Sequence, residues 1–298
     1  MSDVAAERGG GLPVTIVRAC RRGESGGSPT AVLDDVPGMS DRARCAVPTL
    51  AGTSHAVFVS GGEDGGVAMR FFTAAGELPA CGHGTVAGLA VLAERAGGGE
   101  FRTTVRTAGR VLTGRASRPL GQQGDFTAAF DPGPVELSAR AAAELTPVLE
   151  ALKLGPDRAP AAMCVASVGR PRLLVEVPTR AELAALVPDM ERLRAACGQL
   201  RLLGCYVYSA PAPDGRAAAR MFAPSISVPE DIANANSTAC LAAYLARVSG
   251  AARTVAVDMG DSLGAPATVT AAAHPTASGI AVEVGGTAAI DGVVRLRP

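Results

Sequence analysis

The chain has 298 residues, and its 28 basic residues balance its 28 acidic ones, so no net charge draws it to nucleic acid or to an acidic membrane surface. Hydrophobic residues make up 48%, but no uninterrupted apolar run approaches the ~20 residues of a membrane span, which predicts a soluble protein. Tryptophan is absent and aromatic residues make up only 3%, so neither base-stacking platforms nor aromatic cages are expected, and the partner should be a small molecule.

Residues 1–13 carry no apolar stretch of the kind that a signal peptide needs, so we expect a flexible lead-in and a cytoplasmic protein. The 7 cysteines are odd in number and show no C-x-x-C spacing. That pattern argues against both a disulfide framework and a zinc ribbon, so we expect reduced thiols and no metal site. A chain of this length has room for two domains of ordinary size.

The first part of the chain alternates short β-type runs with polar or glycine-rich turns. Period-two patterns predict strands at 14–17, 31–33, 56–59, 69–73, 101–107, 111–113 and 126–130. Ser40 is expected to cap a short helix over 40–46. After breaks at Gly76 and Pro79, residues 85–95 change to the period of a largely buried helix, which the glycines at 97–99 end.

The first turn of this helix carries the strongest chemical signal. The side chains of Gly82, Gly84 and Thr85 are too small to cover the backbone N–H groups, so these donors and the helix dipole favour an anion such as a carboxylate. Cys81 and His83 stand beside the donors, where a thiol ionises more readily and an imidazole carries protons near neutral pH. Either residue alone would indicate only a packed side chain, but together in a Pro-Gly turn they favour a chemical role.

A dinucleotide-binding turn is the competing interpretation of these glycines. Gly82, Gly84 and Gly88 read G-x-G-x-x-x-G, one residue away from the dinucleotide fingerprint, and the expected acidic residue after a second parallel strand is not evident. We therefore expect no nicotinamide cofactor.

The pattern restarts after a candidate boundary at 131–134, where Asp-Pro-Gly-Pro favours a hinge. Helices are predicted at 137–152, 181–196 and 237–248, and strands at 164–168, 173–177, 202–209, 218–222, 254–257, 268–271, 280–284 and 293–296. The alanine-rich stretches at 139–143 and 217–219 are expected to be helix and loop segments without a functional role.

Residues 221–250 repeat the plan of the first turn: a strand carrying Arg and Phe, a proline-containing loop with an acid, a cluster of polar residues and an apolar helix. Asn234, Asn236 and Ser237 are favoured helix caps, so this helix also offers N–H donors. An ordinary cap with Asp231 in solvent is the simpler interpretation. The internal repeat favours a paired active site instead.

These motifs, in their order and spacing, resemble the phenazine-biosynthesis-like (PhzF-like) isomerases within the diaminopimelate epimerase-like superfamily. The matching segments are GGSPTAVLDD at 26–35, TSHAVFV at 53–59, MRFFTAAGELPACGHGT at 69–85, VGRPRLLVEV at 168–177, EDIANANSTACLAAYL at 230–245, GDSLGAPATV at 260–269 and VEVGGTAAIDG at 282–292. The resemblance implies an α+β fold with two pseudo-symmetric domains, each a curved, mostly antiparallel sheet around a central helix. It also implies an N-terminal domain over 1–131, completed by a strand at about 287–298, and a C-terminal domain over 132–286.

Departures from the family pattern bear on the chemistry. The family opens a strand with Ser-Glu, whose Glu moves the proton, and here Ser54 and His55 stand at those positions. Cys81 stands where the epimerase branch carries a catalytic thiol. The second thiol of that branch would fall at Ile232, which transfers no proton, and Cys240 lies a full turn inside the helix, so a one-sided proton shift is preferred to a two-thiol epimerase. A histidine, with a pKa near ~6.5 against ~4.3 for Glu, suits a base that must also return the proton.

Together these features predict a cofactor-independent isomerase that shifts a proton, and with it a double bond, on a small unsaturated carboxylic acid. His55 is expected to be the principal acid/base, with Cys81 or His83 as relay or second acid/base. Asp231 is expected to orient a polar group of the substrate. The expected substrate-binding residues are Ser54, Gly82, Gly84, Thr85, Asn234, Asn236 and Ser237. We further expect a homodimer that acts on a small anionic, amino-acid-derived or cyclic substrate in specialised, antibiotic-type metabolism.

Two alternatives stay open. A cofactor-independent epimerase or racemase would use Cys81 and His55 on opposite faces of an α-carbon. A non-catalytic relative would bind a small ligand without exchanging protons, since the usual Glu is gone.

Overall fold

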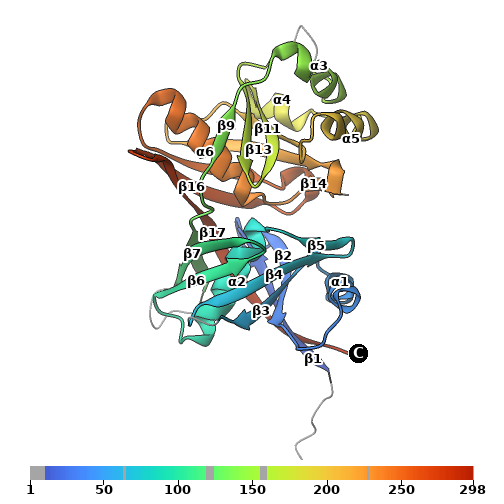
Figure 1. Ribbon diagram of the computed structural model, residues 1–298, viewed down its shortest axis with the longest axis vertical. Coiled ribbons are helices and arrows are strands. Elements are labelled where there is room, and N and C mark those ends of the chain that lie inside the picture. The colour runs from blue at the N-terminus through green and yellow to red at the C-terminus, as the bar shows by residue number, and fades with distance from the viewer. Residues whose placement is uncertain (1–10, 63–64, 119–123, 155–159, 227, 298) are drawn as a thin grey trace, which may run out of the picture.

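The computed structural model describes residues 11–62, 65–118, 124–154, 160–226 and 228–297 (Figure 1). The expected N-terminal lead-in lies outside the described residues up to residue 10, and its last two residues already belong to the first strand. None of the helices within these ranges has the length and apolar character that crossing a membrane requires.

Strands build most of the structure. In chain order they are β1 (Leu12–Ala19), β2 (Ser28–Asp34), β3 (His55–Gly61), β4 (Val67–Thr73), β5 (Gly76–Leu78), β6 (Phe101–Thr107), β7 (Arg110–Ser117), β8 (Phe126–Phe130), β9 (Glu136–Ser138), β10 (Met163–Val168), β11 (Arg170–Val177), β12 (Cys205–Ser209), β13 (Arg216–Ala223), β14 (Val228–Asp231), β15 (Arg253–Met259), β16 (Ala267–Thr276) and β17 (Gly279–Leu296). Most neighbours pair antiparallel, and the parallel pairs are β2 with β3, β4 with β6, β11 with β12 and β13 with β15.

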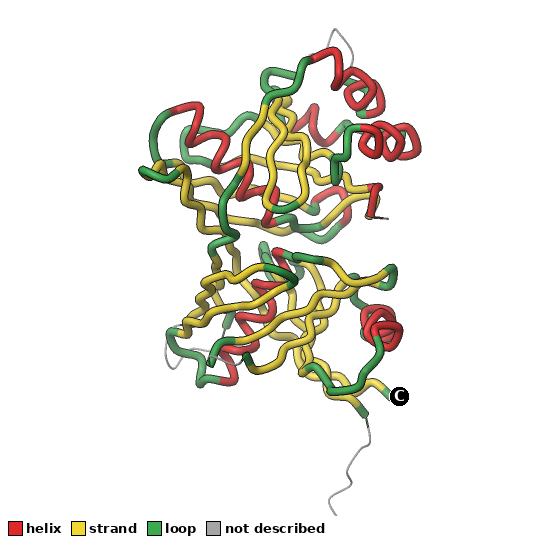
Figure 2. Tube along the Cα trace, viewed as in Figure 1, coloured by secondary structure: helices red, strands yellow, loops and turns green. Residues whose placement is uncertain are grey.

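Two helices lie inside the curved strands, one in each half of the molecule (Figure 1 and Figure 2). The helices are α1 (Asp41–Leu50), α2 (Gly82–Arg95), α3 (Ala142–Ala151), α4 (Arg180–Ala184), α5 (Met190–Gln199) and α6 (Ala235–Ser249). α2 packs on β1, β2, β3, β7, β8 and β17, and α6 packs on β10, β15, β16 and β17. Both helices are apolar on nearly every face because strands surround them, as expected for a helix in a core.

The strand β17 joins the two halves. It pairs with β16 over 279–285, with β8 over 284–288 and with β1 over 288–296. The two separate strands expected in this part of the chain are therefore one continuous strand. The intervening residues are mostly small and carry no strand signal, but neighbouring strands satisfy their backbone N–H and C=O groups.

Two helices of the second half differ from expectation. The first residues of the helix expected over 137–152 pair as β9 with β10, and the helix begins only at α3. The helix expected over 181–196 is divided into α4 and α5. Pro188 restricts the residue before it, and the Asp189 carboxylate then caps the new helix by accepting from the Arg192 N–H at 3.0 Å.

The cap expected at Ser40 is confirmed, because its hydroxyl accepts from the Ala43 N–H at 3.2 Å. The helix α1 that it starts runs on to Leu50 rather than ending at residue 46. The alanines at 217–219, expected as filler, lie in the strand β13, where their side chains are buried.

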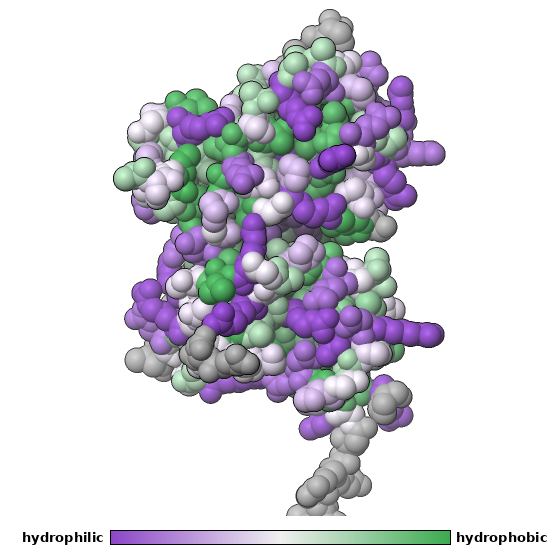
Figure 3. Space-filling model, in the orientation of Figure 1, coloured by the Kyte–Doolittle hydropathy of each residue, from purple (hydrophilic) through white to green (hydrophobic). Residues whose placement is uncertain are grey.

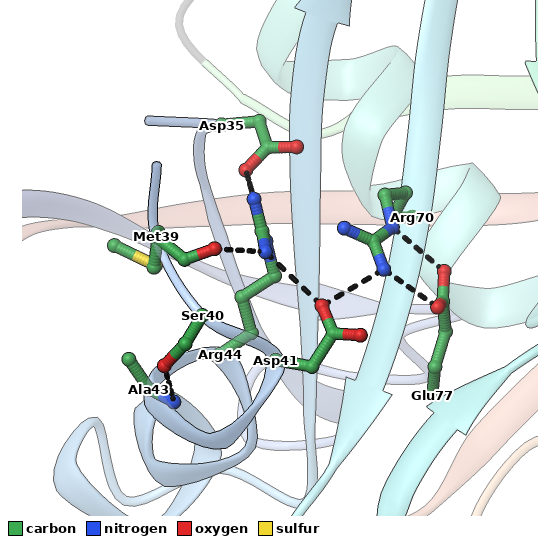
Figure 4. Close-up of polar contacts among 8 residues, drawn as sticks. All are labelled: Asp35, Met39, Ser40, Asp41, Ala43, Arg44, Arg70 and Glu77. Atoms are coloured by element: carbon green, nitrogen blue, oxygen red, sulfur yellow. Dashed lines mark hydrogen bonds and ion pairs between the residues drawn. The ribbon is translucent and has the colours of Figure 1, made fainter. Parts of the chain in front are cut away.

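An ion-pair network holds α1 against the sheet (Figure 4). The guanidinium of Arg44 donates to Asp35 at 2.7 Å and to Asp41 at 3.1 Å. Asp41 also accepts from Arg70, which binds Glu77 at 2.7 Å. The network therefore holds the short strand β5, which was not predicted from the sequence, directly before the loop that enters α2.

Candidate active site

His55 opens the strand β3 and is only 6% exposed. Its Nδ1 lies 2.8 Å from the Ser54 hydroxyl, which leaves Nε2 as the ring nitrogen without a hydrogen-bond partner among the described residues. Burial, reinforced by the charge of His83, lowers the pKa of His55 well below its usual value. At neutral pH His55 is therefore a neutral imidazole, the form that accepts a proton.

Cys81 and His83 form a hydrogen-bonded pair at the start of α2. Cys81 is the N-cap residue, and its Sγ lies 3.4 Å from Nε2 of His83. The other ring nitrogen, Nδ1, donates to the Ala233 carbonyl at 3.0 Å, since a carbonyl only accepts. Burial lowers the pKa of His83, but the charge and hydrogen bond of Cys81, the charge of Asp231 and the Ala233 carbonyl outweigh burial and raise it to about 9. His83 is therefore protonated at neutral pH.

The two histidines touch each other edge to face. Their ring centroids lie 4.4 Å apart with an interplanar angle of 86°. One ring is neutral and the other charged, so a proton acceptor and a proton donor stand side by side. With Cys81 they also place three possible metal-ligand atoms within 4.8 Å of one another. Such nitrogen and sulfur donors suit zinc, although a metal would first have to displace the proton on His83.

The N-terminus of α6 supplies polar groups from the other half of the molecule. Asn234 caps this helix by accepting from the Ser237 N–H at 2.9 Å, and its amide donates to Asp231 at 2.9 Å. The Asp231 carboxylate is thus held by the cap residue and does not point freely into solvent. The ordinary helix cap is therefore present, but Asp231 is bound to the cap residue instead of lying in solvent.

The two helix N-termini form one wall of a cavity of about 250 Å³. In the space-filling view the two halves appear as lobes that meet at a waist (Figure 3). The cavity brings together the following residues that the sequence singled out: His55, Cys81, Gly82, His83, Asp231, Asn234 and Asn236. Ser54 lines an adjoining cavity of about 530 Å³ that shares His55 and Asp231.

Gly84, Thr85 and Ser237 are not among the described residues that line the first cavity. The α-carbon of Gly84 faces the core, because a Cβ there would lie 3.1 Å from the Phe71 ring and 3.2 Å from Val57. The Thr85 hydroxyl donates to the Cys81 carbonyl at 2.9 Å. Ser237 is fully buried and accepts from Arg172 at 3.2 Å. These side chains support the helix ends from behind.

The two helix N-termini approach each other more closely than ordinary side chains allow. A Cβ placed on Gly82 would lie 2.6 Å from the Cβ of Ala235 and 3.3 Å from the backbone nitrogen of Asn236. Real Cβ atoms do not come that close, so the position needs glycine. This approach places the free N–H groups of both helices beside the same cavity.

Three arginines in the cavity wall were not recognised from the sequence. Arg110 comes from β7, and Arg170 and Arg172 come from β11. The sequence did contain a signal, because in the segment 168–177 Arg172 interrupts an apolar strand two positions after Arg170. Alternate residues of a strand share a face, so this spacing could have placed the two arginines on one side of the strand.

Comparisons with known proteins identify relatives of this chain. A family model described as phenazine biosynthesis-like protein matches residues 22–292. The uncharacterised isomerase YddE of Escherichia coli strain K12 is 28% identical over 227 residues, 74% of this chain and 74% of that protein. An uncharacterised isomerase of Clostridium acetobutylicum is 25% identical over 232 residues, with the same coverage of 74% on both sides.

Solved structures share the fold. A PhzF-family phenazine biosynthesis protein from Bacillus anthracis has a TM-score of 0.83 at 17% identity, covering 96% of this chain and 99% of that chain. A predicted epimerase from Pseudomonas aeruginosa has a TM-score of 0.81 at 24% identity, with the same coverage of 96% and 99%. A probable proline racemase from Agrobacterium radiobacter K84, with bound carbonate, has a TM-score of 0.63 at 12% identity, covering 96% and 93%. The epimerase-like fold that the sequence predicted is confirmed.

The contact between the helix ends makes a testable prediction. Replacing Gly82 with Ala should push α2 and α6 apart, since the new Cβ overlaps that of Ala235. Overpacking of this kind destabilises by about 1–3 kcal/mol, which urea unfolding would measure. The double variant Gly82→Ala/Ala235→Gly removes the overlapping atom and should recover part of the loss relative to the sum of the two single changes. Single effects that simply add would show that the helix ends do not need this close contact.

Proposed function

Because the chain belongs to the family of phenazine biosynthesis-like proteins, whose curated relatives are isomerases, we propose that it moves a proton between two carbons of a small unsaturated carboxylic acid. The observation that carries this proposal is the contact between neutral His55 and protonated His83 in the wall of one cavity. A base and an acid that titrate on opposite sides of neutral pH serve both halves of a proton shift.

The hydrogen bonds support an order of the proton carriers. His55 has Nε2 free, so this atom takes the proton from the substrate carbon and the C–H electron pair moves into the neighbouring double bond. Both ring nitrogens of His83 are engaged, one by Ala233 and one by Cys81. His83 therefore acts through Cys81, whose Sγ passes the proton of the His83–Cys81 pair to the second carbon. The proton taken up by His55 then returns to this pair, which restores both groups.

The developing negative charge needs donors that are already in place. Gly82 and Asn236 line the cavity at the starts of two helices, where backbone N–H groups lack intrahelical acceptors. These groups, with the two helix dipoles, hold the substrate carboxylate and the enolate-like charge. Asp231, fixed by Asn234, orients a polar group at the other side of the substrate.

The distance between the proton carriers favours isomerisation over epimerisation. Groups on opposite faces of one carbon would each lie about 3–3.5 Å from it and hence roughly 6–7 Å apart. A ring nitrogen of His55 and the Sγ of Cys81 lie within 4.8 Å. That spacing suits removal and return of a proton on the same face of the substrate, which moves a double bond without inverting a centre.

Further features of this proposal rest on the sequence. We propose an amino-acid-derived or cyclic substrate, a place in specialised, antibiotic-type metabolism, no cofactor, a homodimer and a cytoplasmic location. We also propose that the two domains, 1–131 with the strand at about 287–298 and 132–286, are related by pseudo-symmetry. The matching positions of α2 and α6, each enclosed by strands with its N-terminus at the cavity, support the last point.

Replacing His55 with Ala should abolish exchange of substrate C–H for solvent deuterium, because losing a general base typically slows proton transfer by roughly 10²-fold or more. Mass spectrometry of candidate unsaturated acids incubated in D₂O would measure the exchange. His274→Ala is the matched control, since this exposed histidine lies on β16 away from the cavity. Undiminished exchange in the His55 variant would refute the assignment, and tight binding without exchange in the native protein would favour a non-catalytic relative.

The rate should depend on pH asymmetrically. His83 must be protonated, so activity should fall as the pH rises through about 9, where His83 loses its proton. His55 must be neutral, and its lowered pKa keeps it so until the pH falls well below its usual 6.5. The profile of kcat/KM should therefore be flat across neutral pH. Loss of activity between pH 7 and 8 would contradict the protonated state of His83.

Cys81→Ala should lower kcat by roughly 10²-fold if the thiol carries the second proton. In the native protein, iodoacetamide should alkylate Cys81 in the cavity, and bound substrate should protect it. Cys45 is half-buried on α1 and lies outside the cavity, so its alkylation should not respond to substrate. A Cys81→Ala enzyme within a few-fold of the native kcat would leave His55 as the sole proton carrier.

A further inference from the structure

Three arginines line the active-site cavity, and none has a carboxylate within ion-pair distance in the described part of the chain. Arg110 belongs to β7 in the N-terminal half, whereas Arg170 and Arg172 belong to β11 in the C-terminal half. The Arg110 guanidinium lies against the turn before β11. A Cβ placed on Gly169 in that turn would lie only 3.1 Å from the Nη2 atom of Arg110. The cluster therefore spans both halves of the molecule.

Arg172 is the most enclosed of the three, with 2% of its surface exposed. Its Nη1 donates to the Ser237 hydroxyl at 3.2 Å and its Nη2 donates to the Arg170 carbonyl at 2.7 Å. Its Nε has no hydrogen-bond partner among the described residues. Burial lowers the pKa of Arg172, and the charges of Arg170 and Arg110 lower it further, against an opposing effect of Cys240. No carboxylate of the described residues forms an ion pair with this cluster.

Other enclosed arginines of this chain are paired with acids. Arg44, whose side chain is 8% exposed, binds Asp35 at 2.7 Å. Arg220, whose side chain is 13% exposed, binds Glu230 at 2.7 Å. A buried cation without a counter-charge is unfavourable, so an exception in the wall of a cavity marks a place where a ligand brings the counter-charge.

We propose that Arg110, Arg170 and Arg172 bind a second anionic group of the substrate, which makes the substrate a dianion. The guanidinium fork matches a carboxylate or a phosphate by paired hydrogen bonds, and either group supplies the same oxyanion chemistry. This inference rests on the proposed function for the place of the first carboxylate, at the N-termini of α2 and α6. Because Arg172 is hydrogen-bonded to Ser237 in the first turn of α6, the second anionic group would lie next to that helix end.

Two anion-binding sites would also let the protein discriminate between carboxylic acids with one and with two negative charges. A monocarboxylate would satisfy the helix N-termini and leave the arginine cluster unpaired, whereas a dianion of the right length satisfies both. Charged hydrogen bonds from one guanidinium are worth enough to change affinity by about 10-fold or more. Substrates with one charge should therefore bind weakly.

The test uses binding, which does not depend on turnover. Linear dicarboxylates from succinate to pimelate, and the ω-phosphono monocarboxylates of the same lengths, would be titrated calorimetrically against the native protein. Each dicarboxylate would be compared with its monomethyl ester, which has the same chain and one charge fewer. At least one dianion should bind about 10-fold or more tightly than its matched monoanion. The stronger class, dicarboxylate or phosphonate, identifies the second group.

The variants Arg110→Met and Arg170→Met should remove this preference, because each keeps the bulk of the side chain without its charge. Arg172→Met should remove it as well and leave the melting temperature unchanged or higher, since no carboxylate loses its partner. Arg220→Met is the matched control and should lower the melting temperature, because Glu230 is left without its partner. A merely structural Arg172 would instead destabilise the protein when replaced.

The outcomes separate this inference from the proposed function. The His55→Ala protein, which cannot exchange protons, should keep the preference for dianions. If no dianion binds more tightly than its matched monoanion, or if the arginine variants keep the preference, the second anionic site is refuted. Proton exchange in the native protein would then still stand as the separate evidence for an isomerase.

Discussion

The close approach of two helix N-termini is the constraint on which the site depends. Gly82 leaves room for Ala235, so α2 from one half and α6 from the other begin within van der Waals contact. The approach lets His83 donate to the Ala233 carbonyl across the two halves at 3.0 Å. It also gathers two sets of backbone donors and two helix dipoles on the same cavity. A side chain larger than hydrogen at this position would separate the halves that share the chemistry.

Two histidines in contact have opposite protonation, although burial acts on both in the same direction. Among the described residues His55 is hydrogen-bonded only to the Ser54 hydroxyl, and the charge of His83 adds to the effect of burial in lowering its pKa. His83 has a thiol and a carbonyl on its two nitrogens and the charge of Asp231 nearby. The partners, not the degree of burial, decide which ring is the acid and which is the base.

The distribution of charge around the cavity is consistent with an anionic ligand. Elsewhere the chain pairs its enclosed arginines with carboxylates, and the network around Arg44 shows how such pairs hold a helix on the sheet (Figure 4). At the cavity, arginines from both halves have no carboxylate partner among the described residues. Positive potential at the cavity therefore comes both from arginine side chains and from the dipoles of two helices.

The sequence by itself determined the elements whose signals are local. Neighbours within a few residues determine the strand patterns, the cap at Ser40, the two central helices and the turn with Cys81 and His83. The fold class followed from the resemblance of the motifs to those of a known family. Signals weakened where tertiary pairing overrode propensity. The continuous strand β17 and the short strand β9 owe their conformation to pairing with strands far away in the chain. Pro188 interrupts the helix that the apolar periodicity predicted over 181–196.

Only the tertiary structure decided how the site is connected. The contact of His55 with His83, the use of both His83 nitrogens and the meeting of Arg110 with the turn before β11 join residues from different elements. Sequence spacing contains no information about such distances, because they are set by how the curved sheets close around α2 and α6. The residue types of the acid and the base could therefore be predicted, but their protonation states and their order in proton transfer could not, since both depend on partners brought together by folding.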